Sequence, residues 1–367
     1  MSAFKKQCHP NKKEKMMEKQ YFKFTGSGGE YFKIWIVNLL LTIVTLGIYG
    51  AWAKVRRNQY FYRNTWLDNS SFDYHGDPIA ILKGRIIALI LFTAYSQSIK
   101  ISVTLYFVAL AVVMAILPWL IQRSLKFKLR YSSYHGLRFR FGGSTKDAYM
   151  TFLLWPVLTL FTLYLLSPFT HKSIKQYQHG NSFYGNAPFS FTGTAGSFYK
   201  VYGKAFAISI AAIIGVSLFG GALAGIFGAF GGFAGMSATP SPKQIIMIVA
   251  AVYGFMILAG LFIGPYFSSR INNLIWNNTQ LENFSFGSQL KARGLFWIYL
   301  TNVLGIICTL GLFKPFATVR LLKYKLENMY LEADSHALQQ FVADQAQEPI
   351  SALGEGAADI FDIDISL

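Results

Sequence analysis

Long apolar runs dominate this chain and decide which class of protein it can form. Seven of them are long enough to cross about 30 Å of hydrocarbon as a helix that rises about 1.5 Å per residue. They cover residues 31–52, 84–100, 101–121, 148–169, 201–233, 244–267 and 294–316. Charged residues make up only 14% of the chain, whereas a soluble domain needs roughly 25% to cover its surface. The sequence therefore predicts an all-α multi-pass membrane protein with about seven transmembrane helices.

Basic residues fill the body of the chain, and acidic residues gather at its C-terminal end. The net charge is +17, but no Lys or Arg follows Lys325, so residues 1–326 carry 34 basic and 8 acidic residues. Basic flanks beside apolar helices are typical topology signals and anchors for anionic lipid head groups. No nucleic-acid-binding motif accompanies them. We therefore expect the lipid bilayer, with its anionic lipids, as the partner, and no nucleic acid.

Three regions follow from this distribution. Residues 1–20 are basic but lack the apolar core of a signal peptide, which predicts a flexible arm. Residues 21–330 form the polytopic membrane domain, and residues 331–367 form an acidic tail that we expect to be disordered. Cys8 and Cys308 are too few for a disulfide framework.

An aromatic-x-aromatic-x-small motif occurs five times and predicts an internal repeat. Its copies begin at Phe22, Phe72, Phe139, Phe189 and Phe284. They define repeat units at about 21–71, 72–138, 139–188, 189–283 and 284–330, each of which contains one or two apolar runs. Because alternating aromatic side chains share one face of a strand, we expect short surface β-strands and amphipathic helices around the spans.

Each unit closes its apolar region with an aromatic residue, and in four of the five units an Arg follows four residues later. One helical turn separates the two side chains, which suits the head-group layer of a membrane. The predicted lipid head-group contacts of this kind are Trp52, Arg56, Trp119, Arg123, Arg270 and Arg320. Lys83 and Arg85 begin a span, and we interpret them either as ligands of lipid phosphate or as anchors whose charges snorkel to the interface.

Two topologies fit these units. If every run crosses, two sets of three crossings enter from opposite faces, which is the inverted-repeat count of many secondary transporters. Alternatively, units one, three and five re-enter the membrane and leave every aromatic motif on one basic face. Lys and Arg divide 16 to 18 between the two faces, so the positive-inside rule does not choose between them. We favour full crossing because runs such as 35–49 are continuous and apolar.

Several stretches show a likeness to a known family. They are Phe22-Lys-Phe-Thr-Gly, the run from Trp35 to Tyr49, Trp52-Ala-Lys-Val-Arg-Arg, and Asp73-Tyr-His-Gly-Asp-Pro. Together they resemble the YjgN family of bacterial inner-membrane proteins over about residues 20–330. The resemblance implies a multi-pass location in the bacterial inner (cytoplasmic) membrane. It brings no established activity and no catalytic or binding residues.

Residues that carry chemistry are sparse inside the apolar runs. Between Pro78 and Leu281 the one carboxylate is Asp147, whereas ion-coupled transporters commonly place carboxylates near the midplane. Asn38 and Asn302 each precede the glycine of a Thr-Leu-Gly motif by nine residues. We interpret them either as lining a polar path or as making interhelical hydrogen bonds that fix packing. No metal-ligand spacing, phosphate-binding loop or nucleophile elbow is found, so we predict no catalytic, metal or cofactor site.

Two functional classes remain open. A permease or channel for a small or lipid-like solute is favoured by the span count and the intramembrane Asn residues. The alternative is a non-transporting envelope protein that binds lipid or scaffolds partners, which the basic and aromatic collars and the missing carboxylates favour. We expect no enzymatic activity.

Overall fold

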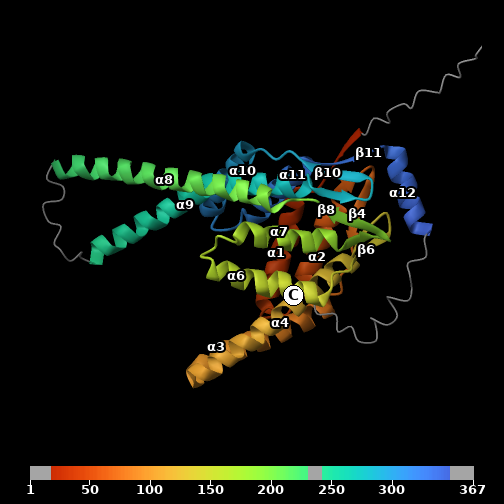
Figure 1. The fold of residues 1–367 in the computed structure, drawn as a ribbon, viewed down its shortest axis with the longest axis horizontal. Coiled ribbons are helices and arrows are strands. Elements are labelled where there is room, and N and C mark those ends of the chain that lie inside the picture. The colour runs from red at the N-terminus through yellow and green to blue at the C-terminus, as the bar shows by residue number, and fades with distance from the viewer. Residues whose placement is uncertain (1–17, 230–241, 348–367) are drawn as a thin grey trace, which may run out of the picture.

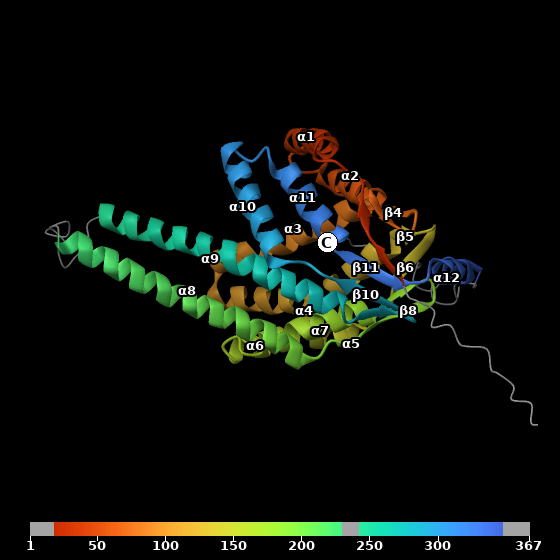
Figure 2. The same ribbon diagram turned by 90° about the horizontal axis from the view of Figure 1, so that it is seen from above.

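The computed structural model describes residues 18–229 and 242–347 of the chain. Most of the predicted N-terminal arm, residues 1–17, lies outside the described residues, and so do residues 348–367 of the predicted tail. In the described part, pairs of helices alternate with short strands along the chain, and the helices extend away from the sheet that the strands form (Figures 1 and 2).

Five helical pairs follow one another within the described residues. They are α1 (Gly28–Val44) with α2 (Gly50–Arg63), α3 (Pro78–Ile101) with α4 (Val103–Arg130), the segment α5 (Thr145–Tyr149), η1 (Met150–Leu154) and α6 (Trp155–Phe161) with α7 (Ser167–Gly180), α8 (Ala195–Ala229) with α9 (Pro242–Trp276), and α10 (Ala292–Cys308) with α11 (Lys314–Glu327). Each pair packs against the next, and α11 of the last pair packs against α1 of the first. The helical layer is therefore a closed ring.

The strands between the helical pairs join into one antiparallel sheet. They are β1 (Glu18–Tyr21), β2 (Lys23–Phe24), β3 (Thr65–Leu67), β4 (Ser70–Tyr74), β5 (Ser132–Tyr134), β6 (Leu137–Phe141), β7 (Ser182–Tyr184), β8 (Ala187–Phe191), β9 (Thr279–Leu281), β10 (Phe284–Ser288) and β11 (Met329–Ala333). The order across the sheet is β1-β11-β10-β9-β8-β7-β6-β5-β4-β3-β2. Its two end strands are consecutive in the chain, so the stretch 18–24 closes the sheet into a barrel-like ring. Leu338 and Val342 of α12 (Ser335–Gln347) pack against the interior of this ring.

The prediction of an all-α protein is therefore wrong, because eleven strands of the described residues form a continuous sheet. Each strand has only two to five residues. Such short segments between long apolar helices contribute little to composition. Several of them pair with a strand on the far side of a helical pair, as β4 does with β5 and β6 with β7. Closing the ring satisfies the backbone hydrogen bonds that isolated short strands would leave open.

The prediction of seven transmembrane helices is also wrong. In the described residues three helices are long and apolar enough to cross a membrane, namely α3, α4 and residues Ala195–Gly215 of α8. The predicted runs 31–52, 148–169 and 294–316 each turn back on themselves. At these turns Leu46, Leu163 and Leu310 have φ of 49°, 49° and 50°, and their side chains are 94%, 84% and 96% exposed. Each of these three apolar runs was predicted to cross the membrane once and instead forms helices joined by a tight turn.

The preference for full crossing fails for the same reason. In units one, three and five the helices on both sides of the turn lead back to the sheet, and the turns lie away from it. Gly47 and Gly311 follow two of the exposed leucines with φ of +95° and +94°, a backbone conformation that glycine adopts without strain. The Thr-Leu-Gly motif is therefore a turn signal inside an apolar run.

The closing proline lies at the start of a helix in two of the short pairs and inside a helix in both long pairs. Pro168 and Pro315 lie at the start of α7 and α11, where a helix needs no N–H donor from its first residues. Pro118 and Pro265 instead lie inside α4 and α9, which continue upstream past the proline. The short pairs turn immediately before this position, whereas the long pairs extend beyond it.

One aromatic residue of each motif lines the inside of the strand ring. The rings of Phe22, Phe72, Phe139, Phe189 and Phe286 follow one another with centroid distances of 6.2, 6.4, 6.4 and 5.9 Å. The fifth member is Phe286 rather than Phe284, where the sequence motif was predicted to begin. Gln289, three residues after Phe286, donates its N–H to the Asn328 carbonyl, just as Thr192, three residues after Phe189, donates to Asn278. The motif could begin at either Phe284 or Phe286. The hydrogen bonds match those of the other unit only if it begins at Phe286.

Candidate anion-binding site

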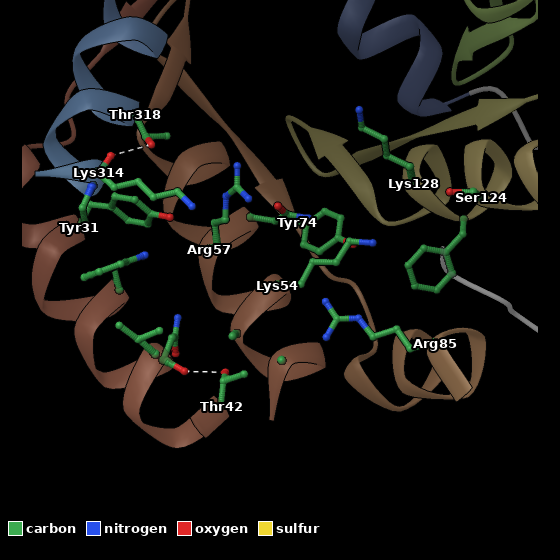
Figure 3. A pocket seen from close by; sticks show the side chains of 18 residues that line it. Tyr31, Thr42, Lys54, Arg57, Tyr74, Arg85, Ser124, Lys128, Lys314 and Thr318 are labelled. Carbon is green, nitrogen blue, oxygen red and sulfur yellow. Dashed lines mark hydrogen bonds between the residues drawn. The ribbon is translucent and has the colours of Figure 1, made fainter. Parts of the chain in front are cut away.

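A cavity of about 620 Å³ opens between α1, α2, α3, α4 and α11 (Figure 3). Five basic side chains line it: Lys54, Arg57, Arg85, Lys128 and Lys314. None of its lining residues, all of which are described, is Asp or Glu. A cavity that several cations line without a carboxylate has a positive potential, and this attracts anions.

The helical ring brings these cations together from three of its five pairs. Lys54 and Arg57 lie one turn apart on α2, whose buried residues Ala51 and Val55 pack in the same apolar cluster as Ile81 of α3. Arg85 extends from α3 into the space beside Lys54, while Lys128 of α4 and Lys314 of α11 lie on opposite sides of the cavity (Figure 3). Since α11 reaches this place only by packing against α1, the site depends on closure of the helical ring.

Lys54 is the most enclosed of the five cations. Its burial lowers the pKa of the ammonium group, and the neighbouring positive charges of Arg85, Lys128 and Arg57 lower it further. The other four side chains are exposed at the mouth of the cavity. Like charges held beside a partly buried Lys raise the free energy of the unliganded site, and a bound anion would relieve that repulsion.

Asn38 adds a polar group to the wall of this cavity. Its Oδ1 atom is buried and has no hydrogen-bond partner within the described residues. Thr42 lies one turn further along α1, and its hydroxyl donates a hydrogen bond to the backbone carbonyl oxygen of Asn38 at 2.6 Å. A side-chain amide offers both a donor and an acceptor, so Asn38 can serve a ligand that carries either.

Asn302, which occupies the corresponding place on α10, is engaged differently. Its Nδ2 donates to the Ala317 carbonyl oxygen at 3.2 Å, and its Oδ1 accepts from Arg320 Nη1 at 3.1 Å. Both partners lie on α11, so Asn302 joins the two helices of the last pair. Of the two asparagines that the sequence singles out, the structure therefore places Asn38 at a cavity and Asn302 at a helix contact.

The predicted head-group residues do not form one site. Arg85 lines the cavity, while Lys83 is exposed on α3 and is not among the lining residues. The remaining ones lie on separate helical pairs, where several contact aromatic residues of their own unit. Arg123 lies 5.5 Å from the ring centroid of Trp119 and Arg270 lies 5.7 Å from that of Tyr266.

In the first unit the corresponding contacts are made through Tyr49. Arg56 Nη1 donates to the Tyr49 hydroxyl at 3.0 Å, and the Trp52 ring stacks on Tyr49 with centroids 6.2 Å apart. These contacts leave Arg56 and Trp52 apart from the cavity, since neither lines it.

Sequence reasoning missed Lys54, Arg57, Lys128 and Lys314. Lys54 and Arg57 stand in the Trp-Ala-Lys-Val-Arg-Arg stretch, three residues apart, which was the one local signal available. Lys128 and Lys314 lie far away in the chain. Only the order of helical pairs around the ring brings them to the same cavity.

A second, smaller pocket of about 370 Å³ contains Asp73 of β4, Ser133 of β5 and His75, which directly follows β4. His75 Nε2 is 2.9 Å from Ser133 Oγ, but His75 Nδ1 is 4.0 Å from Asp73. Asp73 instead accepts a hydrogen bond from Arg63 Nε at 2.8 Å. The carboxylate therefore pairs with Arg63 and does not orient the imidazole as a catalytic triad requires. The described residues also contain no group of three or more His, Cys, Asp or Glu that could hold a metal ion.

The comparisons with known proteins identify the family. Residues 19–360 match the family described as bacterial protein of unknown function (DUF898). The chain belongs to this family. A relative named inner membrane protein YjgN from Salmonella typhimurium strain LT2 is 27% identical over 86% of this chain and 89% of its own length. The protein of the same name from Escherichia coli K12 is 31% identical over 37% of this chain and 35% of its own. No solved structure matches the chain.

The predicted resemblance to the YjgN family is thus confirmed. The names of the relatives, together with the three apolar helices of the described residues, place this DUF898 protein in the bacterial inner membrane. Two of these helices, α3 and α4, contribute side chains to the wall of the cavity.

Proposed function

We propose that this DUF898 protein binds the anionic head groups of membrane lipids in the cavity between α1, α2, α3, α4 and α11. It is then a non-transporting envelope protein whose ligand is part of the bilayer. The observation that carries this proposal is the convergence of five basic side chains without a carboxylate on one cavity of about 620 Å³.

The position of the cavity along α3 favours a lipid head group over a dissolved anion. Arg85 lines the cavity, and Leu89, Ile90 and Phe92, which begin one helical turn further on, are exposed. Large exposed apolar side chains on a helix of this hydropathy are typical of a surface that contacts acyl chains. The change from basic to apolar surface along α3 supports a position of the cavity at the level of the head groups. Basic side chains at that level each contribute about 1 kcal/mol to the attraction of anionic lipid.

The permease prediction has lost its main support. It relied on seven crossings arranged as inverted repeats, but the runs 31–52, 148–169 and 294–316 turn back on themselves. Inverted repeats also require motif copies on opposite faces of the membrane, whereas all the strands that contain the motifs belong to one sheet. Lipid binding needs neither feature.

We also infer that the five units are degenerate copies of one element made of a helical pair and its strands. Backbone hydrogen bonds at corresponding positions support this inference, for example Gly142 N–H to Asn181 and Thr192 N–H to Asn278. Five copies suffice to close both the strand ring and the helical ring. The cavity lies where the last copy meets the first two.

Spin-labelled lipids provide the test. The full chain is reconstituted in phosphatidylcholine, and electron paramagnetic resonance measures the association of spin-labelled phosphatidylglycerol relative to spin-labelled phosphatidylcholine. We expect the wild-type chain to prefer phosphatidylglycerol, and the double variant Lys54→Gln, Arg85→Gln to lose most of that preference. Each cation removed should weaken the selectivity by about fivefold, the equivalent of about 1 kcal/mol.

The matched control is Lys83→Gln, which removes an exposed charge from the same helix two residues away from Arg85. It should leave the selectivity nearly unchanged. The proposal fails if the wild-type chain shows no preference, or if Lys83→Gln reduces the selectivity as strongly as Arg85→Gln. Competition by inorganic phosphate distinguishes a site for free anions, since a dissolved ligand would displace the lipid at millimolar concentration.

A further inference from the structure

The inside of the strand ring contains a further cavity, which shares no lining residue with the cationic one. Its volume is about 410 Å³. Aromatic and aliphatic side chains form almost all of its wall, among them Phe72, Phe139, Phe189 and Leu281 from the strands and Trp276 from α9. It contains no Lys, Arg, Asp or Glu.

Three of the few polar side chains on this wall already donate hydrogen bonds within the protein. The hydroxyl of Tyr134 donates to the Leu67 carbonyl oxygen at 2.8 Å, and that of Tyr184 donates to the Tyr134 carbonyl oxygen at 3.0 Å. Thr65 donates its hydroxyl to the Phe61 carbonyl oxygen at 2.8 Å. A polar ligand would give up its hydrogen bonds to water without replacement, which disfavours it strongly. The wall therefore selects for hydrocarbon.

The size of the cavity is that of a binding site rather than a packing defect. Protein interiors rarely contain voids much larger than a water molecule, whose share of liquid volume is about 30 Å³. Ligand pockets usually measure about 300–1,000 Å³ and bury most of their ligand. A cavity of about 410 Å³ lies at the lower end of this range, which limits the ligand to a small or slender molecule.

Five phenylalanine rings and one helix set the shape of the cavity. Phe72 and Phe139 stack with an interplanar angle of 14°, and Phe189 and Phe286 with one of 21°, so these neighbouring rings lie nearly parallel along the wall. Leu338, Phe341 and Val342 of α12 complete the wall. Phe341 contacts Phe284 and Tyr184, with ring centroids 5.1 and 6.2 Å apart.

We propose that the strand ring holds a single acyl chain of a fatty acid, and that α12 covers it. The apolar wall excludes polar ligands, and a volume of about 410 Å³ favours one slender linear chain over a bulky ring system. The bilayer around the helices supplies molecules with such chains. This site is separate from the cationic cavity and does not depend on the proposed head-group binding.

A photoactivatable fatty acid tests the proposal. The full chain in lipid nanodiscs is incubated with palmitate that bears a diazirine in the middle of its chain, irradiated, and analysed by peptide mass spectrometry. We expect cross-links on β8, β9 or β10 and on α12, and we expect excess unlabelled palmitate to suppress them at least fivefold. Cross-links confined to the outer surfaces of the helical pairs, or strand cross-links that unlabelled palmitate does not suppress, would overturn the proposal.

A matched pair of variants on β9 separates the cavity from its surroundings. Leu281→Trp fills the cavity and should reduce the strand cross-links at least fivefold, while cross-links to the helices remain. Gln280→Trp places the same ring on the opposite face of the strand and should leave the strand cross-links in place. Should Leu281→Trp fail to fold, the competition with unlabelled palmitate in the wild-type chain still decides. The double variant Lys54→Gln, Arg85→Gln should retain the strand cross-links, so this test and that of head-group binding can fail separately.

Discussion

The guanidinium group of Arg85 lies where a side chain on Gly50 would be. A Cβ atom added to Gly50 would collide with Arg85 Nη1. Gly50 is the first residue of α2, and Arg85 belongs to α3, so the absence of a side chain at Gly50 lets Arg85 reach across α2 into the cationic cavity. Position 50 thus controls the geometry of the site without carrying charge.

The variant Gly50→Ala therefore tests geometry at constant charge. Its Cβ displaces the flexible end of Arg85, and we expect the preference for phosphatidylglycerol to fall by about fivefold, corresponding to the loss of one basic contact of about 1 kcal/mol. Spin-labelled lipid association measures the change. Gly29→Ala is the control, because a Cβ at Gly29 meets nothing within 4 Å. An unchanged selectivity in Gly50→Ala would show that Arg85 does not need its present position.

Because of Lys54, the proposed binding should weaken at alkaline pH. Burial and the neighbouring cations hold the pKa of its ammonium group below the ordinary value of 10.5. The group therefore loses its proton, and with it the attraction for an anion, at a lower pH than an ordinary lysine does. We expect affinity for phosphatidylglycerol to fall as pH rises through this lowered pKa. Lys54→Arg should remove this part of the decline, because Arg keeps its charge over the whole range.

A pH titration of lipid association on both chains measures the effect. Equal slopes for the wild-type chain and Lys54→Arg would contradict the assigned role of Lys54.

Part of this architecture could be predicted from the sequence, and the missing part has a physical cause. Membrane location and the aromatic motif follow from local patterns, since apolar runs and alternating aromatic residues are visible in any short window. Residues 31–52 turn back where Leu46 and Gly47 both adopt a positive φ. A continuous apolar run fits both outcomes.

The closed sheet and the cationic cavity depend on contacts between distant parts of the chain. The strand stretch 18–24 closes the ring by pairing with β11, and Phe22 N–H donates to the Met329 carbonyl oxygen at 3.1 Å. Lys314 joins Lys54 at the cavity through the same closure. Local spacing does not show that these residues meet, so the sequence indicated Arg85 and Asn38 but not the other four basic residues of the cavity.

The imidazole of His179 should make this protein less stable at acidic pH. Burial, followed by the nearby charge of Lys175, lowers its pKa from 6.5 to about 4. Its ring packs against Trp276 with centroids 5.4 Å apart, and its Nδ1 lies 3.4 Å from Thr279 Oγ1. Because the unfolded chain binds the proton first, the stabilisation is fully present above pH 6.5 and is lost as pH falls towards 4.

The loss attributable to His179 should be on the order of 2 to 3 kcal/mol. Thermal melting of the detergent-solubilised chain between pH 7 and pH 4 measures it, with His179→Gln as the comparison. We expect the melting temperature of the variant to decline less over this interval. Parallel declines in the two proteins would contradict the assignment.

Gln345 attaches α12 to the strand ring. Its side-chain oxygen accepts hydrogen bonds from the backbone N–H groups of Asn186 and Ala187 at 2.9 and 3.1 Å. Gln345→Ala leaves both donors without this partner, and we expect a cost of about 1 to 3 kcal/mol in the docking of α12. Hydrogen exchange should then accelerate in α12 and at the turn between β7 and β8. Gln340→Ala, an exposed position on the same helix, should leave exchange at that turn unchanged, and unchanged exchange in Gln345→Ala would rule out its role.

The turning back of the apolar runs predicts a specific membrane topology. Asn64, Tyr131 and Asn181 each precede a strand of the same sheet, so reporter fusions after these residues should report the same side of the membrane. Opposite sides for Asn64 and Asn181 would restore the full-crossing arrangement. An internal control is the exposed turn at Leu46, where a Cys should remain inaccessible to membrane-impermeant maleimide because the apolar turn lies in lipid.

Native mass spectrometry of the full chain, extracted from inner membranes, tests the central claim most directly because it counts the lipid that the protein retains. We predict that the wild-type chain and Lys83→Gln retain bound phosphatidylglycerol or another anionic lipid in preference to phosphatidylethanolamine. The double variant Lys54→Gln, Arg85→Gln should lose most of the bound anionic lipid. Equal retention by all three proteins, or retention of zwitterionic lipid alone, would contradict the binding of anionic head groups in this cavity.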